Sequence, residues 1–434
     1  MKKFLAMLLA LVMALSLVAC GEKKDDTKTE GGDTATGSVY YLNFKPESDN
    51  AWKALAATYT EKTGVPVKIL TAASGEYEST LVSEMDKEDA PTLFQCNEGG
   101  VATWGEFCYD LSSSDVYNQL TSKDYALKNA DGEVISIGYC LETYGIIVNK
   151  ALLKEAGYEV TDITNFESLK KIADDIHSRA AELGFDAFTF AGLDGTSSWR
   201  FSGHLANMPL FYEFRDEGVT SKPATIKGTY LDNYKAIWDL YITDSATTGA
   251  ALLSATGDQA EAEFGEGKAV FYQNGTWEYS NLTGEKFGMN ADDLTMIPIY
   301  CGIEGEEKAG LCTGTENYWS VNKNASEEDI KATLDFMNWV VTSDAGTTML
   351  AEQFGPCPFK NAKTPENVFF AQANEYVANG NYTVTWAFNW TPAVDDWRAA
   401  VVDALSKYTT SNGSWDDVKT AFVEGWATQY ANEH

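Results

Sequence analysis

The chain has 434 residues, of which 44% are hydrophobic and 13% aromatic, which supplies enough apolar surface for large cores, excludes disorder throughout, and suggests two large structural units. Asp and Glu number 64 against 32 Lys and Arg, so the formal net charge is -32. No dense basic run follows the first few residues; because nucleic-acid binding needs clustered Lys and Arg, a DNA- or RNA-binding function is excluded.

The N-terminal segment predicts export. Lys2 and Lys3 precede a run of about fifteen mostly apolar residues, which is shorter than a membrane span and typical of a secretory signal. The run ends in Leu-Val-Ala-Cys at residues 17–20. This ending resembles a bacterial lipobox, which implies that Cys20 is acylated and becomes the new N-terminus. An ordinary signal peptide with a coincidental cysteine is the alternative.

The segment after Cys20 predicts a tether. Residues 22–38 contain no aliphatic side chain larger than alanine, so they cannot bury enough surface to offset the entropy of ordering. We expect a lipoprotein signal peptide at residues 1–19 and a lipidated cysteine with a disordered tether at residues 20–38. The anchor then holds the protein on the outer face of the cell membrane, at the cell surface or in a periplasm.

Strands and helices alternate after the tether. Residues 39–44 are β-branched and aromatic and predict a strand, and residues 65–70 predict another. Between them a helical stripe includes Trp52 and Tyr59 and ends at Gly64. The strand–helix–strand pattern recurs with strands at 92–95 and 144–148, which favours a parallel α/β architecture.

Three later helices have clear signals. Apolar residues recur at helical spacing over 165–183, and Gly184 follows. Ser326 and Asp329 have the spacing of a capping box before a helix over 326–342. Ser414 precedes a helix over 415–430 with two acidic residues in its first turn.

Polar side chains follow two of the predicted strands. Asn43 and Lys45 lie just beyond the first strand, and Asn97 and Glu98 follow the strand at 92–95. Ligands of parallel sheets collect beyond the carboxyl ends of the strands. These four residues are therefore candidates for ligand binding.

The cysteines leave two alternatives open. Cys20 aside, the chain has six, which allow fifteen pairings. Cys301 and Cys312 flank a turn-rich segment, and export permits a disulfide between them. Buried free thiols are the competing interpretation. The spacings match no zinc pattern, and we expect no metal site.

A family resemblance rests on several segments together. The lipobox, the acidic tether, YGIIVNKALLKEAGYEV and FGEGKAVFYQNGTWEYSNL resemble the family 1 extracellular solute-binding proteins of ABC importers. The resemblance covers essentially everything from Val39 onward. It implies an α/β fold of the type II periplasmic-binding-protein kind, with two lobes, three hinge crossings and a sugar held in the cleft between the lobes.

The resemblance also implies the boundaries of the lobes. The first lobe is expected to comprise residues 39–143 plus 316–355, and the second residues 146–313 plus 358–434. The hinges are expected near residues 143–146, 313–317 and 354–358.

A sugar site needs aromatic rings beside carboxylates and amides, because sugar rings present C–H faces and hydroxyl edges. The resemblance implies that Trp277, which follows a strand and a glycine turn, stacks on the sugar. It implies ligand contacts for Asp194 and Trp199 in one loop, and for Glu142 and Tyr144 at the first crossing. Packing inside a lobe or at a hinge is the alternative for each of these side chains.

The resemblance also implies a stacking aromatic ring in the segment 386–397, which contains three tryptophans. The resemblance does not decide which of three residues supplies it. The candidates are Trp386, Trp390 and Trp397.

An enzyme has little support. The sequence lacks a G-x-S-x-G elbow, an H-E-x-x-H motif and a Walker loop, and it contains three histidines. A glycosidase needs only two carboxylates, so a surface glycosidase remains an alternative. A receptor for a non-sugar solute, such as a peptide or polyol, is another.

We expect a membrane-anchored, monomeric substrate-binding protein without a cofactor. It would capture a sugar, expected to be an oligosaccharide, and deliver it to the permease subunits of an ABC importer. The acidic surface would disfavour anionic ligands unless Lys45 or Arg200 provides a local positive charge.

Overall fold

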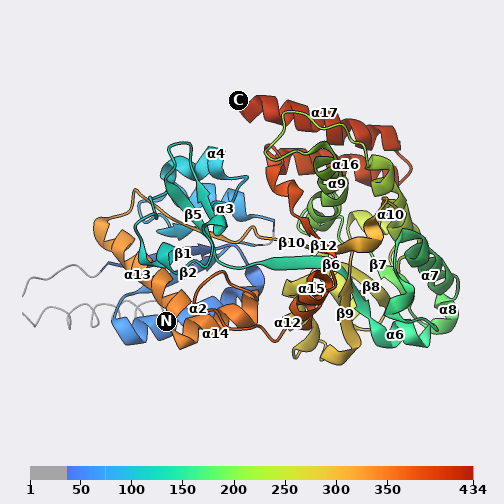
Figure 1. Ribbon diagram of the computed structural model, residues 1–434, viewed down its shortest axis with the longest axis horizontal. Helices are drawn as coiled ribbons and strands as arrows, with labels where there is room; N and C mark the ends of the chain where they lie inside the picture. The colour runs from blue at the N-terminus through green and yellow to red at the C-terminus, as the bar shows by residue number, and fades with distance from the viewer. Residues whose placement is uncertain (1–36, 74, 434) are drawn as a thin grey trace, which may run out of the picture. The chain divides into compact units, whose positions relative to one another are not determined.

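The computed structural model describes residues 37–73 and 75–433, in which the strands form two six-stranded sheets (Figure 1). The signal peptide, Cys20 and nearly all of the predicted tether lie outside the described residues. Within the described part, no helix combines the length and the apolar character needed to cross a bilayer.

The first sheet is built mainly from the N-terminal third of the chain. Strand β1 pairs in parallel with β2 and β3, whereas β11 runs antiparallel to both of its neighbours, β3 and β5. The order of the strands in this sheet is β2 (Val67–Thr71), β1 (Val39–Asn43), β3 (Leu93–Phe94), β11 (Tyr318–Val321), β5 (Val134–Gly138) and β4 (Ala126–Lys128).

The second sheet centres on one long strand, β6, whose eight residues are all buried. Strands β8, β9 and β10 all run antiparallel to β6. The order is β12 (Tyr382–Thr385), β10 (Ala309–Gly314), β6 (Glu142–Asn149), β8 (Ala269–Gly275) and β7 (Asp186–Thr189), with β9 (Leu294–Ile297) paired to β6 off this path.

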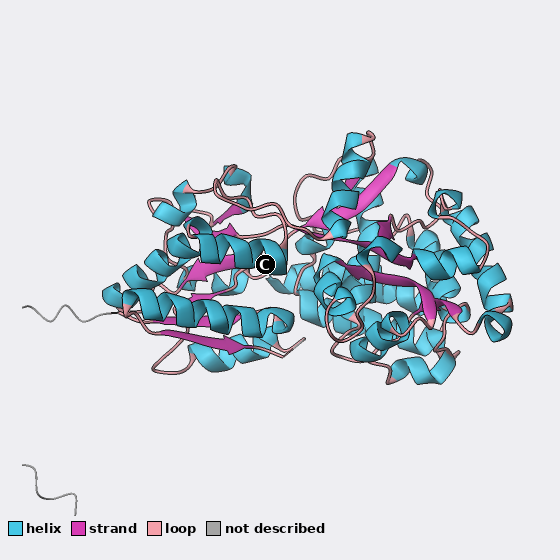
Figure 2. Ribbon diagram, turned by 90° about the horizontal axis from the view of Figure 1, so that it is seen from below, coloured by secondary structure: helices cyan, strands magenta, loops and turns pink. Residues whose placement is uncertain are grey.

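Helices pack on both faces of each sheet (Figure 2). On the first sheet, α2 (Asp49–Thr63), α13 (Glu327–Thr342) and α14 (Asp344–Phe354) share one apolar cluster, and α3 (Tyr77–Met85) and α4 (Val101–Trp104) share the other. A short helix, α5 (Asp115–Asn118), packs against α13.

The second sheet has the larger core. One apolar cluster joins it to α6 (Lys150–Glu155), α7 (Phe166–Ser178), α9 (Asn207–Glu217), α10 (Leu231–Thr243), α16 (Val394–Thr409) and α17 (Trp415–Glu433). A smaller cluster joins it to α11 (Gly257–Gly265), α12 (Tyr279–Thr283) and α15 (Val368–Ala378). Strand alternation explains the division, since Tyr144, Ile146 and Val148 of β6 enter the larger cluster and Ile147 enters the smaller.

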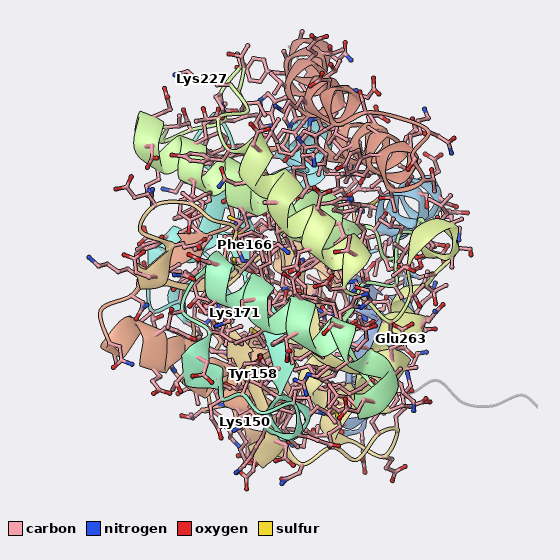
Figure 3. The ribbon with its side chains drawn as sticks, turned by 90° about the vertical axis from the view of Figure 1, so that its right-hand side faces the viewer. Lys150, Tyr158, Phe166, Lys171, Lys227 and Glu263 are labelled. Carbon is pink, nitrogen blue, oxygen red and sulfur yellow. The ribbon has the colours of Figure 1, made fainter. Side chains whose placement is uncertain are left out.

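The helices predicted from local signals are confirmed. Helix α2 buries Trp52 and Tyr59 and ends at Gly64, whose φ of 76° places it in the left-handed region that favours glycine. Helix α7 and the short α8 (Ala180–Leu183) fill the predicted range 165–183. Figure 3 shows α7 on the outside of the molecule, with Phe166 at its start and the exposed Lys171 along its length.

The expected parallel architecture is wrong for much of both sheets. The strand at 144–148 does not continue the first parallel βαβ unit but becomes the centre of the second sheet, with antiparallel neighbours. A strand that is buried on both faces reads as a continuous apolar run, and this pattern does not specify the direction of its partners.

The chain passes between the sheets three times. The first two passages are short, from Gly138 to Glu142 and from Gly314 to Tyr318. After α14 the chain stays with the first sheet: the amide of Leu141 donates to the oxygen of Pro356 at 2.8 Å, and Phe359 is buried against Trp319. The third passage therefore begins after Phe359 and not at 354–358, because the ring of Phe359 completes the first core.

The cysteines of the described residues are all free thiols. Cys301 and Cys312 are both buried, and the thiol of Cys312 points to the sulfur of Met208 at 3.8 Å. Cys301 and Cys312 are therefore buried free thiols, and they do not form a disulfide bond in this structure.

Candidate ligand site

An ion pair joins the end of β1 to the start of β6. Lys45 Nζ lies 2.8 Å from Glu142 Oε1 and 3.8 Å from Glu47 Oε1. Asn317 donates from Nδ2 to Glu142 Oε2 at 2.6 Å. Burial alone would lower the pKa of Lys45, but Glu142 and Glu47 outweigh it and raise the pKa, so the ammonium is charged.

The amide of Asn43 positions that lysine. Its Nδ2 donates to the backbone oxygen of Lys45 at 2.7 Å, and its Oδ1 accepts from the amide of Lys45 at 3.2 Å. A third bond, from Nδ2 to Thr71 Oγ1, ties the turn to β2. Asn43 itself is fully buried, so in this structure it shapes the turn that presents Lys45.

Aromatic rings surround His204, and one of them, Trp277, lies beside the ammonium of Lys45. The imidazole stacks on Tyr144 with a centroid distance of 4.1 Å and an interplanar angle of 8°. It also contacts the rings of Trp199, Trp277, Trp386 and Phe388 at 5.0–5.7 Å. We call these six residues the aromatic cluster.

Two rings of the aromatic cluster remain partly accessible. Trp199 and Trp277 are half-buried and lie 5.9 Å apart, whereas Tyr144, His204 and Trp386 are buried behind them. The ammonium of Lys45 lies 5.2 Å from the centroid of Trp277. A charged, hydrogen-bonding edge and two adjacent indole rings therefore face the same region.

Glycines make room for two of these rings. A Cβ atom on Gly275, at the end of β8, would collide with the indole of Trp277, and one on Gly314, at the end of β10, would collide with the indole of Trp386. Neither glycine has a positive φ. The close approach of a ring, and not backbone strain, explains glycine at both positions.

Gly275→Ala is therefore expected to displace the Trp277 ring without unfolding β8, since alanine adopts the same backbone conformation. We expect ligand affinity to fall about tenfold, which corresponds to about 1.4 kcal/mol, measured by calorimetric titration. Gly105→Ala is the matched control, because the added Cβ would meet its nearest atom at 3.5 Å, an ordinary contact. Equal affinities for the two variants would contradict the role given to Gly275.

His204 is expected to make stability depend on pH. Burial, followed by Arg398, Lys45 and Arg200, holds its pKa well below the ordinary value of 6.5. The unfolded state then binds the proton more readily, so stability is present above pH 6.5 and is lost as the pH falls below it, by about 1.4 kcal/mol per pH unit. Urea titrations from pH 7 to pH 5 should show this slope, and His204→Phe, which keeps an aromatic ring, should reduce it.

The loop that begins at Asp194 supports Trp199. Asp194 accepts from the hydroxyls of Thr196 and Ser197, and these bonds lower its pKa although burial would raise it. The indole of Trp199 donates to the oxygen of Thr196 at 3.1 Å. A Cβ atom on Gly75, beyond β2, would lie 3.3 Å from the oxygen of Gly195, so the two loops meet.

Asn97 and Glu98 lie on the first-sheet side of this region. The Oδ1 atom of Asn97 accepts from the amide of Gly100 at 3.0 Å and fixes the turn. Burial and then the neighbouring Glu316 raise the pKa of Glu98. Burial also raises the pKa of Glu316, against the pull of Arg398 and Lys45.

The three late tryptophans have different places. Trp386 joins the aromatic cluster. Trp390 stacks on Phe214 at 5.7 Å, away from His204. Trp397 is 1% exposed, donates to the oxygen of Phe422 at 2.9 Å, and lies in the core of the second sheet. The ring packs between α16 and α17, so no face of it is accessible to a ligand.

Sequence reasoning missed four groups near the ion pair and the aromatic cluster: His204, Glu316, Asn317 and Arg398. Each lies in a segment whose position depends on the fold, namely the π-helix Arg200–Leu205 before α9, the second passage and the first turns of α16. The guanidinium of Arg398 lies 5.6 Å from the ring of Phe388. The only local signal was the closeness of His204 to Trp199 in the sequence.

Arg200 is not the positive group of this region. It is 1% exposed and donates to the oxygen of Ala191. Its guanidinium lies 4.9 Å from the ring of Phe201 and 5.3 Å from that of Tyr272. Of the two cations considered from the sequence, Lys45 alone borders both the carboxylates and the accessible indoles.

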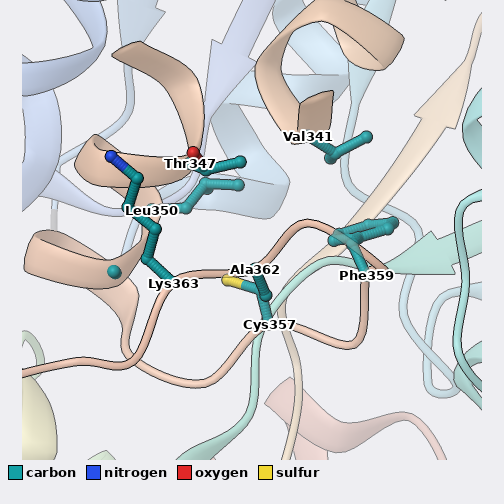
Figure 4. Close-up of a pocket in the computed structure, with 8 residues that line it drawn as sticks. Val341, Thr347, Leu350, Cys357, Phe359, Ala362 and Lys363 are labelled. Atoms are coloured by element: carbon teal, nitrogen blue, oxygen red, sulfur yellow. The ribbon is translucent and has the colours of Figure 1, made fainter. Parts of the chain in front are cut away.

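A narrow hollow with room for about one water molecule borders the ion pair. Its lining includes Glu142, Thr276 and Trp277, together with α14 residues and Phe370. A second hollow, too narrow to hold a water molecule, lies on the first-sheet side (Figure 4) and is lined mostly by apolar groups such as Leu350, Cys357 and Phe359. The second hollow lacks the polar groups that a sugar requires.

The accessible side chains of the site offer both aromatic faces and hydrogen-bonding groups. In the described part of the chain, no group of three or more His, Cys, Asp or Glu side chains could hold a metal ion. Half-buried indoles offer faces for C–H groups, and Lys45, Glu142 and Asn317 offer donors and acceptors for hydroxyl groups.

Comparisons with known proteins agree with this arrangement. A model of the family described as bacterial extracellular solute-binding protein matches residues 54–374. The maltodextrin-binding protein MdxE of Bacillus subtilis (strain 168) is 23% identical over 353 residues, which cover 76% of this chain and 75% of that protein.

Solved structures resemble the chain over most of its length. SBP RafE in complex with raffinose has a TM-score of 0.71 at 16% identity, covering 91% of this chain and 100% of that one. A sugar transporter from Bacillus licheniformis in complex with stachyose has a TM-score of 0.68 at 17% identity, covering 90% and 100%. At these identities the likeness concerns the fold, which has two α/β lobes.

Proposed function

Since the chain belongs to the family of bacterial extracellular solute-binding proteins, we propose that it captures an oligosaccharide between its two lobes and delivers it to the permease subunits of an ABC importer. It is a binding protein and not an enzyme. The observation that carries the proposal is the pair of half-buried indoles, Trp199 and Trp277, 5.9 Å apart beside the Lys45–Glu142 ion pair.

Sugar chemistry fits these groups. An indole face excludes water from the C–H face of a pyranose, and the surrounding carboxylates and amides pair with its hydroxyl groups. The names of the relatives support a sugar ligand, since they mention maltodextrin, raffinose, chitin oligosaccharide and stachyose. Two adjacent indoles favour a ligand of more than one ring.

The proposed site combines residues of both lobes. From the first lobe come Lys45, held by Asn43, and the turn with Asn97 and Glu98. From the second come Trp199, supported by Asp194, and Trp277, with Tyr144 and Trp386 behind them. Glu142 lies at the first passage between the lobes. Trp390 and Trp397 are left out of the proposed site because they pack in the second core.

Lobe closure explains capture without chemistry. We place the passages between lobes at residues 139–141, 315–317 and 364–367, where the chain leaves one sheet for the other. Ligand contacts that exist only when both lobes meet shift the population toward the closed form. The closed form then docks, as a monomer, on the importer.

Thermal-shift screening tests the proposal. The mature protein is heated with oligosaccharides, single amino acids or peptides, and a ligand at 100 times its Kd raises the stability by about 2.7 kcal/mol. We expect an oligosaccharide to raise the melting temperature and to be recovered intact. Stabilisation by an amino acid or peptide alone would replace the sugar with another solute, and a consumed sugar would contradict a binding protein.

The lipid anchor is proposed separately. Cys20 ends a lipobox-like segment, and acylation there would hold the protein on the outer face of the cell membrane. Bacteria fed an alkyne-tagged fatty acid should label the wild-type protein. Cys20→Ala should lose the label and appear in the medium or the soluble periplasmic fraction, and labelling that persists in this variant would contradict the anchor.

A further inference from the structure

The indole of Trp277 is carried by a single 3-10 turn, Thr276–Glu278, which joins β8 to α12. We call this segment the Trp277 turn. The backbone oxygen of Thr276 closes it by accepting from the amide of Tyr279. The turn starts directly after Gly275, and the indole lies so close to this glycine that a Cβ atom there would collide with it. The position of the turn therefore fixes the position of the ring.

One set of anchors for the Trp277 turn comes from its own strand. The Oδ1 atom of Asn274 accepts from the amide of Gly275 at 2.9 Å, and its Nδ2 donates to Glu278 Oε1 at 2.8 Å. These bonds connect the end of β8 to the far end of the turn. Since all of these residues belong to the second lobe, the bonds do not depend on the passages between the lobes.

Two further anchors come from the passages. The amide of Thr143, near the start of β6 where the first passage ends, donates to Thr276 Oγ1 at 3.3 Å. Asn367, at the end of the third passage, donates from Nδ2 to the backbone oxygen of Thr276 at 2.9 Å. Asn367 lies 91 positions further along the chain. Thr276 thus accepts hydrogen bonds from the ends of two of the three passages, and one of them reaches the carbonyl that closes the turn.

The side-chain amide of Asn367 has two separate tasks. Its Oδ1 accepts from the amide of Phe369 at 2.9 Å and caps the start of α15. Its Nδ2 holds the Trp277 turn. An aspartate at this position could still cap α15 but could not donate to Thr276. The two tasks can therefore be separated by substitution.

The surroundings of Asn367 are tightly filled. Asn367 lines the same narrow hollow as Glu142 and Trp277, and the end of α14, in the first lobe, lines another side of it through Gly355. A Cβ atom on Gly355 would collide with the ring of Phe370 in α15. Close-packed groups transmit a displacement instead of absorbing it. A change in the third passage should therefore reach the Trp277 turn.

We infer that Asn367 is a positioning residue of the proposed ligand site, which holds the Trp277 turn from the third passage and makes the position of the ring depend on the conformation of that passage. The inference rests on the proposed function, since its effect on affinity requires that Trp277 contacts the ligand. Asn367 belongs neither to the aromatic cluster nor to the Lys45–Glu142 ion pair. It would act on the ligand only through the ring.

Hydrogen exchange of the unliganded protein, followed by mass spectrometry, tests the anchoring itself. Asn367→Asp keeps the acceptor for Phe369 and replaces the donor to Thr276 with a second acceptor. Asn367→Ser keeps a capping hydroxyl on a side chain too short to reach Thr276. We expect both variants to exchange faster than the wild type over residues 276–283, with α15 still protected. Unchanged exchange over residues 276–283 in both variants, or an equal increase in α15, would overturn the inference.

Calorimetric titration tests the effect on binding, with the short neutral oligosaccharide that stabilises the wild-type protein most. Both Asn367 variants should bind it about fivefold more weakly, as expected for the loss of one hydrogen bond. In the Trp277→Ala background, Asn367→Asp should cause no further loss, because no indole remains to be positioned. Equal losses in the two backgrounds would show that Asn367 acts by another route and would overturn the inference.

Asn165→Asp is the matched control. Asn165 caps α7 in the same way, since its Oδ1 accepts from the amide of Ser168 at 2.9 Å, but α7 lies on the outside of the molecule (Figure 3). This variant should match the wild type in affinity and in exchange over residues 276–283. Wild-type affinity of Trp277→Ala would contradict the proposed site itself. Weak binding by Trp277→Ala together with wild-type binding by both Asn367 variants would overturn only the role of Asn367.

Discussion

Trp277→Ala is expected to weaken oligosaccharide binding by roughly tenfold while the fold stays intact. The indole is only partly accessible, so roughly 60 Å² of its surface remains for a ligand to cover; at about 25 cal/mol per Å² this area contributes about 1.5 kcal/mol to binding. Its other contacts are with Trp199, His204 and the ammonium of Lys45. Calorimetric titration of the two proteins with the same sugar measures the effect.

Trp390→Ala is the control for this substitution. It removes the same side chain from a position that stacks on Phe214 and not on the aromatic cluster. We expect it to lower the urea midpoint with little change in affinity, the reverse of Trp277→Ala. If Trp277→Ala binds as tightly as the wild type, or if both variants lose affinity equally, the indole of Trp277 is not part of the ligand site.

The second large effect concerns the ion pair. Glu142→Gln is expected to lower the free energy of unfolding by about 3 kcal/mol, because it leaves the Lys45 ammonium buried without its nearest carboxylate. The two side chains are 12% and 6% exposed, and Glu47, at 3.8 Å, compensates only in part. Urea denaturation of the unliganded protein measures the change.

A double-mutant cycle separates this charge effect from general damage. In Lys45→Met/Glu142→Gln the buried charge is removed with its partner, so most of the lost stability should return. Met fills nearly the same volume as the lysine stem. Additive losses from the two single variants would show that the charges do not stabilise each other in the folded protein.

Local signals predicted the elements of the fold better than their partners. The stripe of α2 and the cap at Gly64 depend on neighbours within a few residues, so spacing was enough to predict both. The direction of β6 depends on its pairing with β8, and the place of Phe359 depends on its bridge to Leu120; both partners are more than a hundred positions away. Sequence spacing also allowed a disulfide between Cys301 and Cys312, although both are buried free thiols in the fold.

The same contrast between local signals and long-range packing applies to the candidate site. Trp277 and Trp199 were predicted to share a site from a family resemblance, and they lie side by side. His204 was not predicted, since a lone histidine in a sequence gives no sign that five rings surround it. Both Trp386 and Trp397 were candidates from the sequence, but the indole of Trp397 packs between α16 and α17. Only the packing of those helices distinguishes them.

The structure of the complex with the oligosaccharide identified by screening tests the central claim most directly. We predict that a sugar ring covers the accessible face of Trp277, with Trp199 beside it, and that its hydroxyl groups bond to Lys45 or Glu142. A sugar bound between the lobes but away from both indoles, or bound on the outside of one lobe, would contradict the proposed site.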